Sequence, residues 1–203
     1  MSFLVGLDAS FTRTGITIID LTTKKIWFET ASCKIGEKQF ENVFKAAKSI
    51  VDQLKAIITN HCGDDFDLIM ESPLPCSSMS SALYSLDTLI YKEFEPHIKK
   101  TYNPATLRSK IHGRKYTKTD SQDLAGKYLN ILNTKMYTIL SVMGTKRKVC
   151  HDCCESLLYC HLFLKESEHP DFQFDNSEEI KKYKDRMKEL KKKEKALLSN
   201  KDL

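Results

Sequence analysis

Hydrophobic and polar positions alternate over the first thirty residues in a way that predicts three short strands. Apolar and β-branched side chains fill residues 4–8, 15–21 and 26–31. The links at 9–14 and 22–25 are short and polar, which is typical of hairpin turns. The pattern therefore predicts an antiparallel β-meander at the start of the chain.

A helical period follows the meander. Between residues 40 and 58 the apolar side chains recur every three or four positions, at Phe40, Val43, Phe44, Ala47, Ile50, Val51, Leu54 and Ile58. The short apolar run at 67–71 then predicts a buried strand, because Ser72-Pro73-Leu74-Pro75 stops it. Glu71 is expected at the tip of that strand.

The later elements complete an α/β fold. We expect a helix over 77–94, a strand over 98–102, a helix begun by Asn103 and Pro104, and further helices over 120–132 and 148–164. The order βββαβαβα predicts a mixed five-stranded sheet flanked by helices. Beyond residue 166 a linker leads to a Lys/Glu-rich stretch with few apolar positions, so we expect a folded domain over 1–166 and a helical tail over 167–203.

Composition narrows the classes of protein. Of the 203 residues, 41% are apolar and 29% are charged, and no apolar run approaches the ~18 residues of a membrane span. The start of the chain lacks the basic region of a signal peptide. Seven cysteines, an odd number, suit free thiols in a reducing compartment. We expect no membrane partner, and a location in the cytoplasm or in the DNA-containing compartment of the host cell.

Acidic residues stand where a sheet of this kind binds ligands. Asp8 and Glu71 end two predicted strands, and ligands sit at the C-terminal ends of parallel strands. Asp152 and Glu155 are three residues apart, so they share one face of a helix. Four carboxylates brought together would repel each other unless a cation compensates them, and Mg²⁺ or Mn²⁺ prefers such oxygen ligands.

Basic residues border these acids. Residues 105–119 contain no acid and five cations, namely Arg108, Lys110, Arg114, Lys115 and Lys118. A pair of metal ions ~4 Å apart can stabilise the attacking and leaving oxygens of phosphodiester cleavage. An acidic site flanked by cations therefore indicates a nuclease. The tail adds positive charge, since residues 178–202 hold ten lysines or arginines against six acids, and it is either a solvated helix or a DNA contact.

The same residues also have structural interpretations. Asp8 could cap a turn, Glu71 could pair with a surface lysine, and Asp152 with Glu155 could form a solvated helix face. His151 could lie near the metals or at the start of the helix. Residues 150–161 hold four cysteines and two histidines, but zinc sites use separated pairs around a turn, so we expect core cysteines instead.

Taken in order, the motifs resemble those of the RuvC-like Holliday junction resolvases of the RNase H superfamily. The matching segments are Gly6-Leu7-Asp8-Ala9-Ser10 with Thr14-Gly15, Ile69-Met70-Glu71, Asn103-Pro104 through Lys110 with Gly113 and Lys118-Thr119-Asp120, and Asp152-Cys153-Cys154-Glu155. The resemblance covers roughly residues 3–165. Two positions depart from it, since Glu155 replaces a common aspartate and Leu74 stands where an aromatic wedge often occurs.

The resemblance implies an RNase H-like fold and a homodimer that resolves four-way DNA junctions by paired nicks. It implies two Mg²⁺ ions per active site, with Mn²⁺ as a substitute, held by Asp8, Glu71, Asp152 and Glu155. Lys118 would stabilise charge on the scissile phosphate. DNA contacts would come from Leu74 and the five cations of residues 105–119.

Three other functions remain in view. The same fold and metals could act on an RNA/DNA hybrid or on structured RNA. The chain could also be a non-catalytic DNA-binding relative. An ATP-binding module is disfavoured, because the actin-like architecture that begins with a similar Gly-Asp hairpin needs two such domains.

Overall fold

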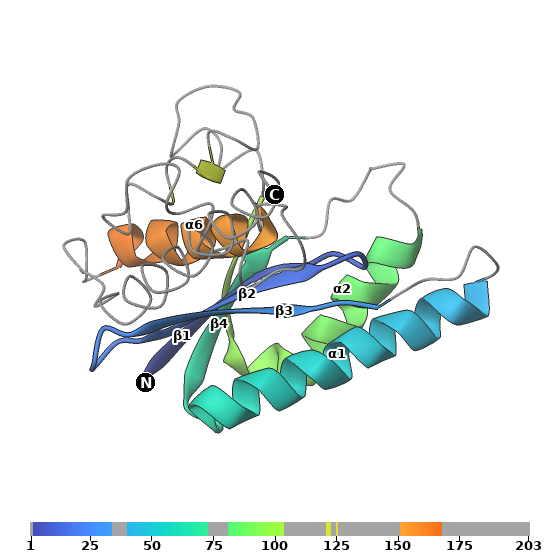
Figure 1. Cartoon of the computed structure of the whole chain (residues 1–203), viewed down its shortest axis with the longest axis horizontal. Coiled ribbons are helices and arrows are strands. Elements are labelled where there is room, and N and C mark those ends of the chain that lie inside the picture. Colours follow the sequence, from blue (N-terminus) through green and yellow to red (C-terminus); the bar gives the residue numbers. More distant parts are fainter. Residues whose placement is uncertain are drawn as a thin grey trace, which may run out of the picture.

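The computed structural model describes residues 2–33, 40–72, 81–103, 121, 122, 125 and 151–167. Its five strands form one sheet in the order β3-β2-β1-β4-β5 (Figure 1). The strands are β1 (Phe3–Asp8), β2 (Thr14–Asp20), β3 (Ile26–Ala31), β4 (Phe66–Glu71) and β5 (Ile98–Tyr102). The first three pair antiparallel, whereas β4 and β5 run parallel to β1. The mixed sheet expected from the sequence is confirmed.

Helices cover both faces of this sheet. They are α1 (Phe40–Cys62), α2 (Ser81–Phe94), which continues into the 3₁₀ turn η1 (Glu95–His97), and α6 (His151–Glu166). Figure 1 shows α1 and α2 on one side and α6 on the other. Successive side chains of β1 point to opposite faces of the sheet, so Val5 and Leu7 join the core under α1 and α2, whereas Leu4 joins the core under α6. Among the described helices, none is long and apolar enough to cross a membrane.

Helix α1 is longer than its apolar pattern predicted. The pattern ends at Ile58, but the helix runs to Cys62. It stops at Gly63, which has a φ of 59° and donates its backbone N–H to the carbonyl of Thr59. Glycine adopts this left-handed conformation without penalty, so it ends the helix. The glycine therefore ends α1 directly after Cys62, which is still buried in the core.

Two glycines let α6 lie directly on the sheet. A Cβ atom on Gly6 would overlap the carbonyl oxygen of Ser156, and one on Gly15 would overlap the backbone of Asp152. The buried hydroxyls of Thr17 and Ser156 are 2.7 Å apart and hydrogen bond beside this contact. The backbone of α6 thus has a fixed height above β1 and β2.

Several expected elements lie outside the described residues. These are the helix beginning at Asn103 and Pro104, most of the helix over 120–132, and the tail beyond residue 167. Residues 121, 122 and 125 of the second helix are described and are helical. The division of the chain at residue 166 stays a prediction.

We predict that Gly15→Ala lowers the free energy of unfolding by on the order of 3 kcal/mol, because the new methyl group has to displace the α6 backbone. Gly63→Ala is the matched control. Nothing lies near its Cβ position, so only the positive φ is strained, at about 1 kcal/mol. Urea unfolding of both variants measures the difference, and equal losses would contradict a close approach at Gly15.

Candidate active site

Strands β1 and β4 bring the first two acids together. The parallel register pairs Leu7 with Met70, so the next residue on each strand, Asp8 and Glu71, ends its strand at the same edge of the sheet. Both are partly buried. The sequence had placed these residues at strand ends, and the structure shows that the two strands are neighbours.

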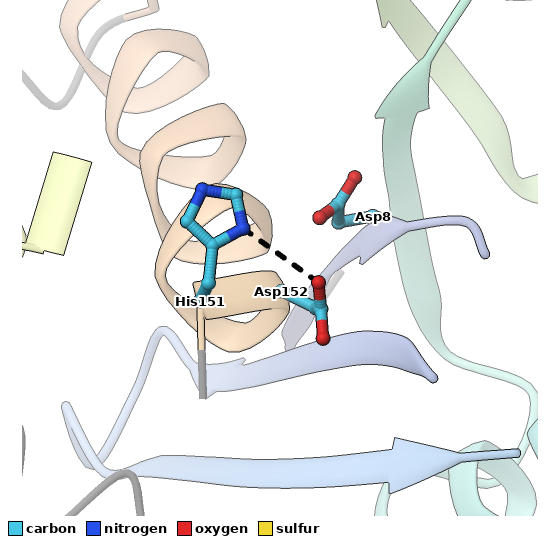
Figure 2. Close-up of side chains that lie close together, drawn as sticks. All are labelled: Asp8, His151 and Asp152. Atoms are coloured by element: carbon cyan, nitrogen blue, oxygen red, sulfur yellow. Dashed lines mark ion pairs between the residues drawn. The ribbon is translucent and has the colours of Figure 1, made fainter. Parts of the chain in front are cut away.

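Helix α6 supplies the other two acids from its first two turns. Asp8 pairs with Gly15 in the β1–β2 ladder, and the backbone of Asp152 lies against that same glycine. Asp8, His151 and Asp152 each offer a ligand atom within 4.8 Å of the others (Figure 2). Glu155 follows one turn later and is 8% exposed. Packing therefore places residues 8 and 152 side by side.

The electrostatics of Asp8 reflect this crowding. Burial raises the pKa of Asp8 well above its usual range, and the negative charges of Glu71, Glu155 and Asp152 raise it further. The other three acids singled out from the sequence thus all act on Asp8. The arrangement stores repulsion that a bound cation would relieve.

Two cationic side chains partly compensate the acids. Arg13 Nε lies 2.7 Å from Asp152 Oδ2. His151 Nε2 lies 3.1 Å from Glu155 Oε1, and its Nδ1 lies 3.6 Å from Asp152 Oδ1. Burial raises the pKa of Asp152, but the adjacent His151, the hydrogen bond from Arg13 and the charges of both cations outweigh it, so the net shift is downward. Burial lowers the pKa of His151, but its acidic neighbours raise it to about 9.

Glu71 has a partner in the core. The buried Tyr159 donates its hydroxyl to Glu71 Oε2 at 3.3 Å, and its ring stacks on Tyr102 with centroids 6.3 Å apart. A fifth acid, Asp87 on α2, is also buried. Burial and then the charge of Glu71 raise the pKa of Asp87 to about 7. The acidic site therefore extends toward α2.

Comparison with known proteins locates this arrangement within a known fold. No protein-family model matches the sequence, and neither does any curated protein. Among solved structures, Thermus thermophilus RuvC is similar with a TM-score of 0.51 at 10% identity, over 81% of this chain and 95% of that one. This chain has the fold of RuvC. The RNase H-like fold that the motifs implied is confirmed.

Two further solved structures are similar at lower TM-scores. The yeast mitochondrial Holliday junction resolvase Ydc2 matches with a TM-score of 0.47 and 11% identity, over 77% of this chain and 75% of that one. The fowlpox virus resolvase, solved with substrate Holliday junction DNA, matches with a TM-score of 0.44 and 17% identity, over 80% and 99%.

Other residues of the RuvC resemblance lie outside the described part of the chain. These are Leu74, Arg108, Lys110, Arg114, Lys115 and Lys118. Conversely, no sequence pattern singled out Arg13, Tyr159 or Asp87. Arg13 stands in a polar link and Tyr159 on an apolar helix, so neither pattern marks it as a neighbour of an acid.

The donor set suits a hard divalent cation. Among the described residues, the one group that could hold a metal ion combines two carboxylates with one imidazole and contains no cysteine. Oxygen donors favour Mg²⁺ and Mn²⁺, and His151 would join them as a ligand only after losing the proton that its acidic neighbours stabilise. Cys153, Cys154 and Cys160 are instead fully buried in the α6 core, as expected from their helical pattern.

We predict that Asp8→Asn stabilises the metal-free protein at pH 8. The folded pKa of Asp8 lies above its unfolded value, so the wild type loses stability as the pH rises between those two values. An amide removes this loss, and the advantage of the variant should shrink toward pH 5. Thermal unfolding in a chelator at both pH values measures it.

Asp20→Asn is the control for that prediction. Hydrogen bonds from Thr22 and Thr23 hold the pKa of Asp20 below its usual value, although the slight burial of the group opposes them. The same substitution should therefore destabilise the protein at pH 8. An Asp8→Asn variant that is no more stable than wild type at pH 8 would show that Asp8 is not under the repulsion described.

Proposed function

We propose that this chain is a metal-dependent endonuclease that cleaves branched DNA, and that its substrate is the four-way junction. The observation that carries the proposal is the meeting of Asp8, Glu71, Asp152 and Glu155 at one edge of a RuvC-type sheet. The motif order of the RuvC-like resolvases supports the choice of substrate. DNA recombination or repair is the corresponding role in the cell.

The four acids are proposed to hold two Mg²⁺ ions, which Mn²⁺ could replace. Such ions supply Lewis-acid stabilisation of the attacking and leaving oxygens. The chain's own contribution is orientation, because Asp8 and Glu71 are fixed by the sheet while Asp152 and Glu155 are fixed by α6. Lys118 is proposed to stabilise charge on the scissile phosphate, and Leu74 with the cations of residues 105–119 to contact the DNA.

We also propose that the protein works as a homodimer. Resolving a junction requires nicks in two opposing strands, and two subunits related by a two-fold axis would supply one active site for each. The candidate surface lies on α1 and α2, where Phe44 and Tyr84 are 56% and 64% exposed. Light scattering at micromolar concentration, with and without a junction, should give the mass of a dimer, and a monomer in both samples would overturn the assembly.

A panel of substrates tests the function. Labelled four-way junction, Y-shaped, linear duplex and RNA/DNA hybrid substrates of equal length are incubated with the protein and Mg²⁺ or a chelator. We expect the junction to be cut fastest and the chelator to stop cleavage. Faster cutting of the hybrid would replace the resolvase with a ribonuclease. Junction binding without any cleavage in Mg²⁺ or Mn²⁺ would favour a non-catalytic relative.

Substitutions at the acids test the site. Asp8→Asn and Asp152→Asn should each lower the cleavage rate by roughly a hundredfold or more, because an amide cannot supply the lost charge to a bound cation. Junction binding in a gel-shift assay should stay close to wild type, since no basic contact is removed. Asp52→Asn, an exposed acid on α1, is the control and should cut normally. Cleavage by Asp8→Asn within a few-fold of wild type would remove Asp8 from the site.

A further inference from the structure

Arg13 ties the link between β1 and β2 to the start of α6. Its Nε donates to Asp152 Oδ2 at 2.7 Å, across 139 residues of chain. The two side chains are only 24% and 19% exposed, so water screens this ion pair less than it screens one on the open surface. The pair lies within the acidic site itself, because Asp152 is one of the four acids.

The backbone that carries Arg13 is itself held in place. Thr14 donates its hydroxyl to the carbonyl of Ser10 at 2.8 Å and accepts the backbone N–H of Ser10 at 3.2 Å. On the other side of Thr14, Gly15 lies against the backbone of Asp152. Both ends of the ion pair are thus anchored by contacts that do not involve it, which gives the guanidinium a defined direction toward the carboxylate.

The two oxygens of Asp152 have different surroundings. Oδ2 accepts the hydrogen bond from Arg13, whereas Oδ1 lies 3.6 Å from His151 Nδ1. Figure 2 shows that one oxygen of Asp152 is paired with His151 and that the other oxygen points away from His151. With Oδ2 held by Arg13, Oδ1 is the oxygen of Asp152 that lies on the side of Asp8 and His151.

We propose that Arg13 is a positioning residue that sets the metal affinity of the site by holding the Asp152 carboxylate in its ligating orientation. This rests on the proposed function. Ligating carboxylates are commonly oriented by a hydrogen-bonded partner, and removing such a partner typically costs about 10- to 100-fold in metal affinity. Without Arg13, the partly exposed carboxylate would turn toward water and would have to be reordered by the metal.

An increase in metal affinity on removal of Arg13 would have an equally clear physical basis, so the direction of the change in affinity decides between the two roles. A positive charge 2.7 Å from Asp152 also repels a cation, so a guanidinium that acted only as a counter-charge would weaken metal binding. Removing it would then raise metal affinity. A positioning role therefore predicts weaker metal binding without Arg13, whereas a counter-charge role predicts tighter metal binding.

The test is a Mn²⁺ titration of the full chain, followed by calorimetry, without DNA. We expect Arg13→Gln to weaken Mn²⁺ binding by about 10- to 100-fold. Arg13→Lys should recover most of the affinity, because one N–H donor is enough to hold Oδ2. Unchanged or tighter Mn²⁺ binding by Arg13→Gln would overturn the proposal.

Lys100→Gln is the matched control. It breaks another ion pair of the same 2.7 Å length, a more exposed one to Glu166 at the far end of α6, so it should leave Mn²⁺ binding unchanged. Thermal unfolding in a chelator reports any general loss of structure. If Arg13→Gln bound Mn²⁺ more weakly only in proportion to a loss of folded protein, the role of Arg13 would be structural and the proposal wrong.

A double variant that combines Arg13→Gln with Asp152→Asn separates a positioning role of Arg13 from an indirect effect. In an Asp152→Asn protein the carboxylate that Arg13 orients is absent, so adding Arg13→Gln should change Mn²⁺ affinity little further. A full additional loss would show that Arg13 acts elsewhere. Failure of the proposed function looks different: wild type would bind Mn²⁺ without cutting a junction, and the effect of Arg13 on Mn²⁺ would still be measurable.

Discussion

The contact between the α6 backbone and two glycines is the constraint on which the site depends. Gly6 and Gly15 carry no side chain, so the first turns of α6 come down onto β1 and β2 at backbone distance. Gly15 is also the ladder partner of Asp8. The close approach at these two glycines therefore sets the distance between α6 and the sheet and places Ser156 against Thr17. It also brings Asp152 beside Asp8, although the two residues are far apart in the sequence.

Charge explains why the acids differ although they share one site. The pKa of Asp8 is raised, because burial and three acidic neighbours act on it, and His151 opposes them only in part. The pKa of Asp152 is lowered, because Arg13 hydrogen bonds to it and His151 lies beside it, which together outweigh its burial. Burial raises the pKa of both acids, yet the net shifts of Asp8 and Asp152 have opposite directions. The cations of the chain hold Asp152 charged and oriented, while the repulsion on Asp8 is left for an incoming cation to relieve.

Local patterns predicted the elements and the acids, but not the contacts across the fold. Alternation marked the strands and placed Asp8 and Glu71 at their ends, because burial on a sheet repeats every second residue. No pattern reported that Gly15 would face Asp152, or that Tyr159 would donate to Glu71, since each depends on how α6 is seated. In the sequence Arg13 is one residue of a polar link, and only the position of α6 makes it a neighbour of Asp152. The end of α1 was likewise not visible in the apolar pattern, because it depends on the backbone conformation of Gly63.

The proposed function assigns chemistry and substrate choice to different parts of this chain. The four acids stand on strands and a helix that pack into one core, and a metal site of this kind would serve any phosphodiester. The proposed preference for a branch would therefore come from contacts with the DNA backbone over a wider surface, for which the cations of residues 105–119 are the proposed source. Substitutions among the acids should slow every substrate alike, whereas substitutions among those cations should change the order in which substrates are cut.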